Sequence, residues 1–443
     1  MSIESARRVA RRLREAGYEA LFAGGCVRDR LRCVEPNDYD IATSAGPDEV
    51  QALFDKTVPV GAEFGVVLVI EDERRYEVAA FRQDVGSRDG RHPAAVRPTD
   101  ARTDALRRDF TINGMFEDPE SEEVLDYVNG REDLRAGIVR TIGDPLQRFT
   151  EDRLRMLRAV RFATVLDFVL DPETAAAVER EAGAIAQVSM ERIQQELNRI
   201  LTSGRGGRGL GLLHEVGLLD VVLPEVAAML GVPQPPAFHP EGDVFTHTRM
   251  LLDDYRGGGI EVALAALLHD VAKPPTLSRD DTGRIRFFGH ADLGAEMAGE
   301  ILSRLRYSND TVRRVQDLVA RHMDWPNLPK MREAKRRRWL LRPDFDLHLE
   351  LHRLDCRASH GDLSLHEAMS AERERIEAQP PPLRPLICGK TLIAMGFEPG
   401  PAFKLILDAV VDERLEGRLQ SEDEARSFVE RHYAPPLGEE REG

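Results

Sequence analysis

The spacing of apolar residues changes near residue 147, and this change constrains the fold more than any other feature of the chain. Before it, short apolar stretches alternate with polar turns, which predicts strands over 18–23, 40–43, 64–71 and 75–81. After it, apolar residues follow a helical period almost to the end of the chain. We therefore expect an N-terminal α/β head with a mixed sheet, followed by an all-α region.

Two segments define the expected core of the head. The run Val66-Val-Leu-Val-Ile70 is apolar at every position, as in a strand buried on both faces, so we place it at the centre of the sheet. Ahead of the first strand, Val9, Ala10 and Leu13 predict an amphipathic helix that ends at Gly17.

The length of 443 residues exceeds what one hydrophobic core supports, so we expect several domains. Proline- and glycine-rich stretches indicate where the boundaries lie. The expected domains are the head at 1–145, a helical neck and body at 146–235, a further helical domain at 236–378 and a C-terminal helical tail at 379–443.

Stretches rich in Pro, Gly, Asn and Asp predict interruptions of regular structure. The polar stretch 84–103 is expected to be a mobile loop of the head. The residues after Tyr433 are expected to fray. Breaks between helices are expected at 203–211, 231–243, 256–259 and 274–284.

Charge and cysteine content restrict the class of protein. The chain carries 77 acidic and 61 basic residues, and its net charge of −16 argues against indiscriminate binding to nucleic acid but not against a local basic surface. The four cysteines lack metal-binding spacing, so we expect reduced thiols in a cytoplasmic protein. We expect no membrane contact, because no apolar run reaches the length of a membrane span.

A glycine pair followed by two aspartates is the first group of residues with chemical meaning. Asp38 and Asp40 are two residues apart, so on a strand their carboxylates point to the same face. Gly24 and Gly25 let backbone N–H groups approach a phosphate, and Arg28 can donate two hydrogen bonds to its oxygens. Each piece alone is common on solvated turns, but their order is rare. Together they predict nucleotidyl transfer, with catalytic aspartates that hold Mg²⁺.

Two further features of the head belong with this site. The adjacent arginines of Arg107-Arg-Asp-Phe-Thr-Ile-Asn-Gly-Met115 lie either at a solvated edge or against a triphosphate. Glu77, on a neighbouring predicted strand, is a candidate for a third carboxylate.

A charged row opens the helical region. Thr150 is the predicted N-cap, and Asp152, Arg155, Arg158 and Arg161 step by three, which in most helices is an exposed row of ion pairs. Cytosine and adenine both present an amino donor beside a ring-nitrogen acceptor, whereas uracil and guanine present an acceptor beside an N–H donor. A carboxylate beside a guanidinium complements the first order. Asp152 with Arg155 is therefore expected to select C and A without a template.

The motifs GGCVRD, DYDIAT, RRDFTING and EDRLRMLRAVRFA, in this order, resemble the class II tRNA nucleotidyltransferase/poly(A) polymerase family, which includes the CCA-adding enzymes. The resemblance covers 20–230, and 388–401 is also similar to the tail of CCA-adding members. It implies addition of C and A to the tRNA 3′ end from CTP and ATP, Mg²⁺ on Asp38 and Asp40, and an RNA- and nucleotide-binding neck and body. It implies nucleotide contacts at Gly25, Arg28, Arg108, Asp152, Arg155, Arg158 and Arg161.

Some segments bear on which nucleotides are added. The resemblance implies that 84–99 is a flexible loop supporting the switch to A, and 59–65 looks like the CCA-adding rather than the polyadenylating pattern. The chain departs from the family at 32–33, where Leu-Gly is frequent, at Gly114, where alanine is usual, and at 79–80, where threonines are common. No departure removes an implied ligand.

A second set of residues resembles the HD metal-dependent phosphohydrolase superfamily, which makes 236–378 an HD-type domain. A histidine, an adjacent His-Asp pair and a distant aspartate can hold one divalent metal, and two more histidines can bind a second metal or the phosphate. The residues for the first metal are His247, His269, Asp270 and Asp355. Those for a second metal or the phosphate are His290 and His322. Such a domain either hydrolyses a cyclic phosphate or phosphomonoester at an RNA end or remains a helical scaffold.

The basic run at 330–338 is either a solvated face or a contact to the tRNA backbone. Three other functions stay open: an enzyme that adds only A or polyadenylates, an HD phosphohydrolase with an inert head, and a non-catalytic RNA-binding protein. The sequence carries no signal for the oligomeric state.

Overall fold

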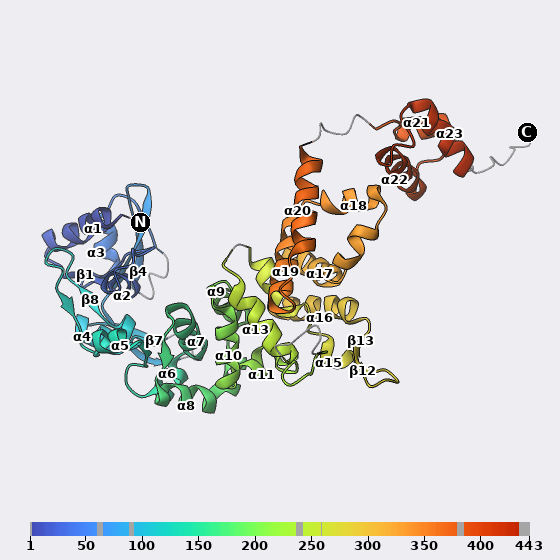
Figure 1. The fold of residues 1–443 in the computed structure, drawn as a ribbon. Helices are drawn as coiled ribbons and strands as arrows, with labels where there is room; N and C mark the ends of the chain where they lie inside the picture. The colour runs from blue at the N-terminus through green and yellow to red at the C-terminus, as the bar shows by residue number, and fades with distance from the viewer. Residues whose placement is uncertain are drawn as a thin grey trace, which may run out of the picture.

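The computed structural model describes residues 2–59, 65–87, 93–235, 242–257, 259–378 and 385–433, with backbone alone at 84–87 and 93–96. The molecule is elongated and curved, with the head at one end and the C-terminal helices at the other (Figure 1). Among these residues, no helix has the length and apolar character needed to cross a membrane.

The head contains a seven-stranded mixed sheet in the order β3-β4-β5-β2-β1-β8-β9. Its strands are β1 (Ala20–Ala23), β2 (Asp40–Thr43), β3 (Thr57–Val58), β4 (Val66–Glu71), β5 (Arg74–Ala80), β8 (Phe116–Glu117) and β9 (Val124–Leu125). β2 and β5 are parallel, and all other neighbours in the sheet are antiparallel. The predicted mixed sheet is confirmed.

The expected central position of β4 is wrong, because β4 lies one place from the sheet edge and β2 is the middle strand. Val67 and Val69 are buried in the core, whereas Val66, Leu68 and Ile70 are only half-buried. Val66 lines a cavity on the other side. An apolar run does not distinguish a strand covered on both faces from one whose second face borders a cavity.

Helices pack around this sheet. They are α1 (Ile3–Glu15), α2 (Gly25–Leu31), α3 (Pro47–Leu53), α4 (Ala101–Leu106), α5 (Gly130–Ala136) and the 3-10 helix η2 (Thr111–Asn113). The predicted apolar positions Val9, Ala10 and Leu13 of α1 are fully buried in the core of the head.

The expected loop at 84–103 is wrong in its secondary structure. Arg82–Ser87 (β6) and Pro93–Pro98 (β7) pair as an antiparallel ribbon, and α4 begins at Ala101. Residues 88–92 lie outside the described residues. Composition predicted a loop because Arg, Asp, Gly and Pro are rare in strands, but backbone hydrogen bonds between paired strands do not depend on side chains.

The neck and body consist of short helices. They are α6 (Pro145–Glu151), α7 (Arg155–Leu166), α8 (Pro172–Glu181), the 3-10 helix η3 (Ala182–Gln187), α9 (Met190–Leu201), α10 (Gly206–Glu215), α11 (Leu218–Val222) and α12 (Pro224–Ala227). Short parallel strands β10 (Ile138–Val139) and β11 (Val169–Leu170) connect the head to this region.

The expected break at 203–211 is wrong, because most of it is the first turns of α10. A Cβ on Gly207 would lie 1.9 Å from the carbonyl oxygen of Arg249, on the neighbouring helix α13 (Val244–Asp254). The glycines therefore permit a close approach of two helices rather than a turn.

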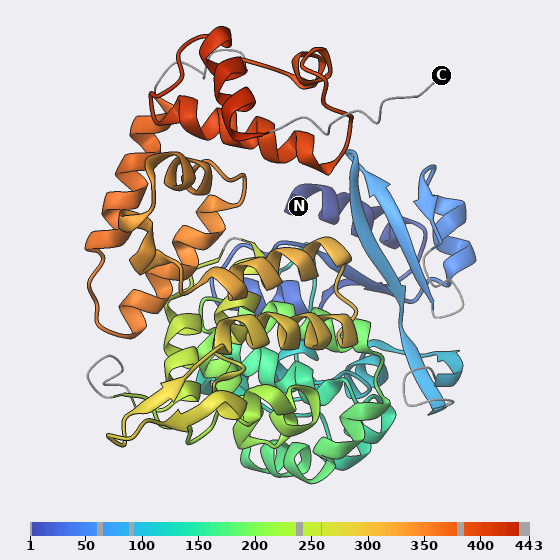
Figure 2. The same ribbon diagram turned by 90° about the vertical axis from the view of Figure 1, so that its right-hand side faces the viewer.

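The remaining helices form the body and the tail. After α13 come α14 (Ile260–Leu268), α15 (Lys273–Thr276), the hairpin β12 (Leu277–Arg279) and β13 (Ile285–Phe287), α16 (His290–Arg304), α17 (Asn309–Arg321), the 3-10 helix η4 (Trp325–Lys330), α18 (Glu333–Leu340), α19 (Phe345–Ala358), α20 (Ser364–Glu377), α21 (Gly389–Ala394), α22 (Pro401–Leu415) and α23 (Glu422–His432). Figure 2 shows α21 to α23 in red, beyond the rest of the helices.

One buried apolar cluster extends from Phe149 to Ala358 and therefore crosses the expected boundary at 235. The tail has a cluster of its own, from Ile387 to Val429. The division at 145, 235 and 378 stays a prediction.

Candidate active site

A cavity of about 540 Å³ lies where the sheet of the head meets the neck. Its walls come from β1, β2, β5, α2, the segment 107–113, α7 and α9. It brings together, from head and neck, all the residues predicted for nucleotide binding and for the Mg²⁺ site of the head: Gly24, Gly25, Arg28, Asp38, Asp40, Arg107, Arg108, Asp152, Arg155, Arg158 and Arg161.

Three carboxylates line one part of this cavity. Asp40 begins β2, and Asp38 lies just before the strand rather than on it. The parallel register places Asp40 opposite Glu77 of β5. Burial, together with the charges of Glu77 and Asp38, raises the pKa of Asp40 to about 7, and burial and Asp38 also raise the pKa of Glu77. These carboxylates thus lack sufficient positive charge nearby, and a divalent cation such as Mg²⁺ fits their chemistry.

The glycine turn places Arg28 at the cavity. Gly24 has φ +71° and precedes α2, and a Cβ there would lie 3.1 Å from Nη1 of Arg108. Arg28 donates from Nη1 to Oδ1 of Asn113 at 2.7 Å and pairs with Asp29 through its other nitrogens. The guanidinium is therefore oriented before any ligand arrives.

The arginine pair of the second motif is held by a residue that sequence analysis missed. Asp104 is buried and accepts hydrogen bonds from Arg107 at 2.8 Å and from Arg108 at 3.1 and 3.0 Å. Both arginines line the cavity. Their position three and four residues after an aspartate was the available signal.

The predicted N-cap at Thr150 is wrong. α6 ends at Glu151 and α7 starts at Arg155, so the motif contains a helix break. The Thr150 hydroxyl donates to the Leu146 carbonyl within α6, while Asp152 has an extended backbone and accepts from the N–H of Leu154 at 3.0 Å.

The alternative interpretation of this motif, an exposed row of ion pairs along one helix, does not hold, because each charged residue has a different partner outside the row. Arg192 of α9 donates two hydrogen bonds to Asp152, at 3.1 and 2.7 Å. Arg155 pairs with Glu151 at 2.7 Å and donates to the Arg107 carbonyl at 3.2 Å. Arg192 lines the cavity but lies 40 residues from Asp152, so no local spacing indicated it.

The next two arginines of the row are paired with buried carboxylates. Arg158 donates to Asp109 at 2.8 and 2.5 Å, and Arg161 donates to Glu196 at 2.5 Å. Burial alone would raise the pKa of Asp109, but the charge and hydrogen bonds of Arg158, the charge of Arg155 and the N–H of Phe110 together outweigh it and lower that pKa to about 2. These pairs keep a wall of oriented guanidinium groups along the cavity.

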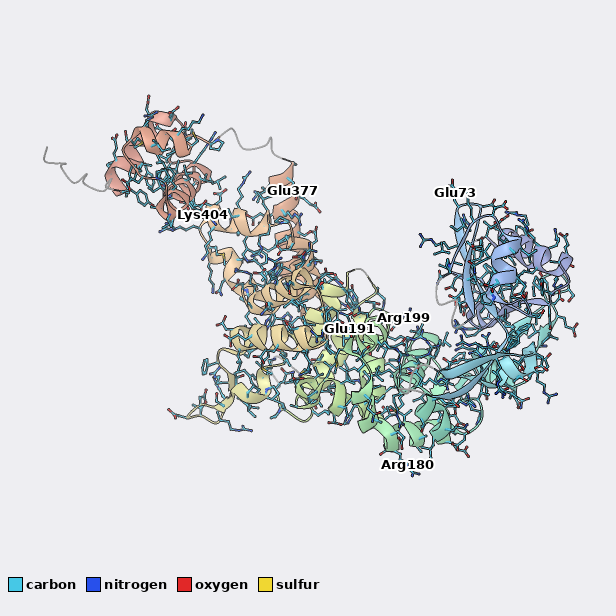
Figure 3. The ribbon with its side chains drawn as sticks, turned by 180° about the vertical axis from the view of Figure 1, so that it is seen from behind. Glu73, Arg180, Glu191, Arg199, Glu377 and Lys404 are labelled. Carbon is cyan, nitrogen blue, oxygen red and sulfur yellow. The ribbon has the colours of Figure 1, made fainter. Side chains whose placement is uncertain are left out.

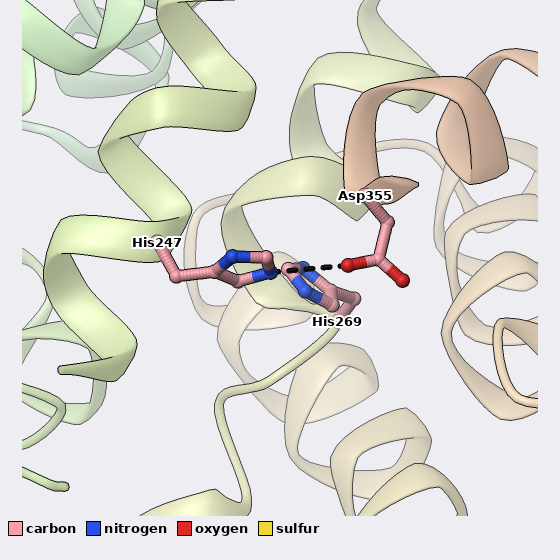
Figure 4. A group of neighbouring side chains, drawn as sticks. All are labelled: His247, His269 and Asp355. Carbon is pink, nitrogen blue, oxygen red and sulfur yellow. Dashed lines mark hydrogen bonds and ion pairs between the residues drawn. The ribbon is translucent and has the colours of Figure 1, made fainter. Parts of the chain in front are cut away.

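A second cluster lies in the helical body and contains all the residues predicted for the HD site. The nearest ligand atoms of His247, His269 and Asp355 lie within 4.8 Å of one another, as do those of Asp270, His290 and His322. Figure 4 shows the first group, in which Nε2 of His247 is 3.1 Å from Oδ1 of Asp355.

Asp270 lies between the two groups rather than only with the first. Its Oδ2 is 3.1 Å from Nε2 of His269 and 4.0 Å from Nε2 of His247. Its Oδ1 is 3.7 Å from Nε2 of His290 and 3.9 Å from Nε2 of His322. Asp270 is thus close enough to contribute to either group of ligands.

The histidines are oriented as metal ligands are. Nδ1 of each of three histidines contacts a carbonyl three residues earlier: His269 at 3.0 Å from Ala266, His290 at 2.8 Å from Phe287 and His322 at 2.6 Å from Val319. A carbonyl only accepts, so Nδ1 carries the proton and Nε2 presents a lone pair. In the described part of the chain, Nε2 of His269 is buried without a hydrogen-bond partner. Burial lowers the pKa of His322 to about 4, which keeps this imidazole neutral. A divalent metal fits this donor set.

The basic run at 330–338 is partly neutralised. Arg336 pairs with Glu372, and Arg338 pairs with Asp412 of the tail. Lys330, Arg332 and Lys335 are exposed, which leaves a smaller basic surface than the sequence indicated.

Three family profiles match successive parts of the chain. Residues 20–140 match "Poly A polymerase head domain", residues 167–230 match "Probable RNA and SrmB- binding site of polymerase A", and residues 243–358 match "HD domain".

Curated relatives match over the full length or over half of it. The chain is 35% identical to an A-adding tRNA nucleotidyltransferase of Deinococcus radiodurans over 93% of the chain and 95% of that protein. It is 34% identical to a CC-adding tRNA nucleotidyltransferase of Thermus thermophilus over 93% of both. A CCA-adding enzyme of Limosilactobacillus reuteri is 43% identical over 48% of the chain and 53% of that protein.

Solved structures share the fold. The Bacillus stearothermophilus CCA-adding enzyme in complex with CTP matches with a TM-score of 0.73 and 27% identity, over 97% of the chain and 98% of that structure. The Thermotoga maritima CCA-adding enzyme complexed with tRNA matches with a TM-score of 0.58 at 17% identity, over 96% and 94%; this likeness shows the fold alone.

Proposed function

The chain belongs to the tRNA nucleotidyltransferase family, and we propose that its head cavity adds C and A to the 3′ end of tRNA from CTP and ATP. The family is one of enzymes, so the alternative of a non-catalytic RNA-binding protein is set aside. The observation that carries the proposal is the single cavity that collects every predicted nucleotide and metal residue of the head.

The reaction is a displacement at phosphorus. The terminal ribose hydroxyl of tRNA attacks the α-phosphorus of the bound nucleotide, a new P–O bond forms, and the bond to the β-phosphate breaks to release pyrophosphate. Asp38, Asp40 and Glu77 would hold Mg²⁺, which when bound supplies positive charge to the triphosphate and acidifies the attacking hydroxyl. A carboxylate of this group accepts the hydroxyl proton, and Arg28 and Arg108 orient the triphosphate.

Asp152 and Arg155 select the base. The Asp152 carboxylate accepts a hydrogen bond from the exocyclic amino group, and Arg155 donates to the ring nitrogen beside it. Arg192 and Glu151 hold these two side chains in place. Uracil and guanine present the reverse order and leave both groups unpaired, which is costly in a cavity.

Which nucleotides are added is tested by measuring incorporation on truncated tRNA. Cytosine and adenine offer the same donor–acceptor order, so Asp152 and Arg155 do not separate them. The two relatives that match over nearly their whole length are named as A-adding and CC-adding tRNA nucleotidyltransferases. The segments expected to decide, 59–65 and 84–99, lie partly outside the described residues.

The experiment supplies tRNA lacking one, two or three terminal nucleotides with CTP and ATP, separately and together. CCA addition predicts that all three substrates are completed, with C incorporated before A. Completion of only the first substrate identifies an A-adding enzyme, and arrest after two cytidines identifies a CC-adding one. Continued growth with ATP identifies a poly(A) polymerase.

The histidine cluster favours a second activity, hydrolysis of a phosphoester at an RNA end. The two groups of ligands would hold divalent metal, which when bound supplies an activated water to attack phosphorus. For a 2′,3′-cyclic phosphate, one ring P–O bond breaks and a phosphomonoester remains. Nε2 of His269, which is buried and makes no hydrogen bond within the described part of the chain, supports this assignment.

The test of this activity is release of product from an RNA ending in a 2′,3′-cyclic phosphate, in the presence of Mg²⁺, Mn²⁺ or Zn²⁺. His269→Asn should abolish product formation, and His360→Asn, at an exposed position, should not. An intact protein that turns over no such RNA end with any of these metals would make the body a scaffold.

A further inference from the structure

A buried glutamine lies beside the histidine cluster and was not part of any predicted site. Gln234 is 3% exposed and precedes α13, the helix that carries His247. Its backbone N–H donates to the Gly242 carbonyl at 3.3 Å, and the adjacent N–H of Val244 donates to Val232 at 3.1 Å. These backbone pairs set the position of the amide side chain.

The orientation of the Gln234 amide is fixed by a lysine. Oε1 accepts a hydrogen bond from Nζ of Lys273 at 2.5 Å, and rotation of the amide would place two donors against each other. Nε2 therefore points away from Lys273. Within the described residues this nitrogen is buried and has no hydrogen-bond partner. A buried N–H donor without an acceptor is unfavourable, so an acceptor other than the described residues completes the site.

Lys273 connects this amide to the histidine cluster. It is 6% exposed, and its Nζ lies 2.7 Å from Oδ2 of Asp270 and 5.3 Å from the ring centre of Phe287. Asp270 is the carboxylate shared by both ligand groups. Lys273 thus links the Gln234 amide to Asp270, one of the residues that would hold metal.

We infer that Gln234 and Lys273 form a phosphate-binding site that holds a phosphoryl oxygen of the substrate at the histidine cluster. A tetrahedral phosphate offers several oxygens, so one can face a cation while another accepts from N–H donors. The carboxamide N–H of Gln234 and the ammonium group of Lys273, on two residues in direct contact, match that requirement. This inference rests on the proposed hydrolysis of an RNA-end phosphoester and names the residues that position its phosphate.

The experiment is calorimetric titration of inorganic phosphate into the full-length protein loaded with Mn²⁺. Gln234→Met removes the donor with little change in volume and should weaken phosphate binding by ~10-fold or more. Mn²⁺ affinity should stay at the parent value, because Gln234 is not a ligand. The melting temperature of Gln234→Met should fall, because Lys273 loses the acceptor Oε1 as well. Gln234→Glu retains the acceptor for Lys273 and serves if the Met variant folds poorly; it should weaken phosphate binding as well.

Gln195→Met, at an exposed position of α9, is the matched control and should bind phosphate as the parent does. Unchanged phosphate affinity in both Gln234 variants, or no phosphate binding by the parent, overturns the inference and leaves Nε2 facing only water. Phosphate binding that depends on Gln234 in a protein that hydrolyses no RNA end supports the site and refutes the hydrolysis. If the Gln234 variants hydrolyse the RNA-end phosphoester with the KM of the parent, the phosphate-binding site is refuted and the hydrolysis is supported.

Discussion

At the scale of single residues, the head site is defined by carboxylates that lack countercharge. Asp40 is flanked by Asp38 and Glu77, and its raised pKa follows from burial beside these like charges. The positive charge of Arg108 lowers the pKa of Asp40 and of Glu77, but both pKa values remain above the ordinary value. A cation that binds the triphosphate would therefore relieve repulsion in the protein at the same time.

Replacing either aspartate should separate catalysis from binding. Asp38→Asn or Asp40→Asn should lower nucleotide incorporation by at least ~10³-fold, because charge stabilisation at the transferred phosphate is lost. Binding of tRNA, measured by filter retention, should stay unchanged. Asp48→Asn, at an exposed position of α3, is the control, and incorporation at the parent rate by either active-site variant would refute the assignment.

Removing the partner of Asp152 should weaken base selection without removing the base-reading groups. Arg192→Ala frees the carboxylate that two hydrogen bonds hold, so the ratio of kcat/KM for CTP to that for UTP should fall by ~10-fold. Asp152→Ala or Arg155→Ala should lower the ratio further. Arg180→Ala is the control, since Arg180 is exposed on α8, at the other edge of the neck from Arg199 (Figure 3). Unchanged selectivity in all three active-site variants would mean that the base is read elsewhere.

At the scale of elements, ion pairs connect the motifs of the head to the helices of the neck. The pair between Asp109 and Arg158 joins the segment before η2 to α7. The break between α6 and α7 also connects separate segments, because it lets Asp152 accept a hydrogen bond from Arg192 of α9. The cavity thus depends on how three separate segments meet.

The Asp109 pair should make stability depend on pH in a defined window. Its folded-state pKa of about 2 lies below the ordinary value of 3.8, so the pair stabilises the fold fully above about pH 4 and loses its effect as pH falls through about 2. Asp109→Asn should therefore lower the free energy of unfolding by ~2 kcal/mol at neutral pH and by progressively less between pH 4 and pH 2. Urea unfolding at several pH values measures this difference. Asp220→Asn, at an exposed position, should show no such trend.

The contact between α10 and α13 requires glycine. In Gly207→Ala the new methyl group would meet the Arg249 backbone, so the helices must move apart at a cost of ~1–3 kcal/mol. Gly183→Ala, where nothing lies within 4 Å of the new Cβ, should change stability by less than ~0.5 kcal/mol. Thermal unfolding of the two variants tests the comparison, and equal melting temperatures would contradict it.

At the scale of the whole molecule, the nucleotide cavity and the histidine cluster share no residue. The cavity is built from segments between Ala23 and Arg199, and the cluster from segments between His247 and Asp355. Figure 1 shows the head at one end of the curved molecule and the helices of the cluster in its middle. Two chemistries can therefore act on one RNA end without competing for the same side chains.

Variants in one site should leave the other active. His322→Gln should abolish hydrolysis of the cyclic phosphate and keep nucleotide incorporation within about twofold of the parent, since effects at separated sites are close to additive. Asp40→Asn should show the opposite pattern. Loss of both activities in either variant, with an unchanged melting temperature, would show that the two sites are coupled.

Much of the head site was predictable because its residues are close together in the chain. Gly24, Arg28, Asp38 and Asp40 fall within one short strand-helix-strand unit, where spacing translates directly into geometry. The helix break at Asp152 was missed, since the charged sequence around it is compatible with a continuous helix. The β6–β7 ribbon was missed because its composition is that of a loop.

Spacing of residues was thus sufficient to identify the chemistry, the family and the mixed sheet. Folding decided which partner each charged group has. Asp152 meets Arg192 across 40 residues, and His247 meets Asp355 across 108. No local rule connects residues at such separations, because their encounter depends on how helices pack in three dimensions. The same holds for the Nε2 of Gln234, whose lack of a partner becomes visible only in the folded chain.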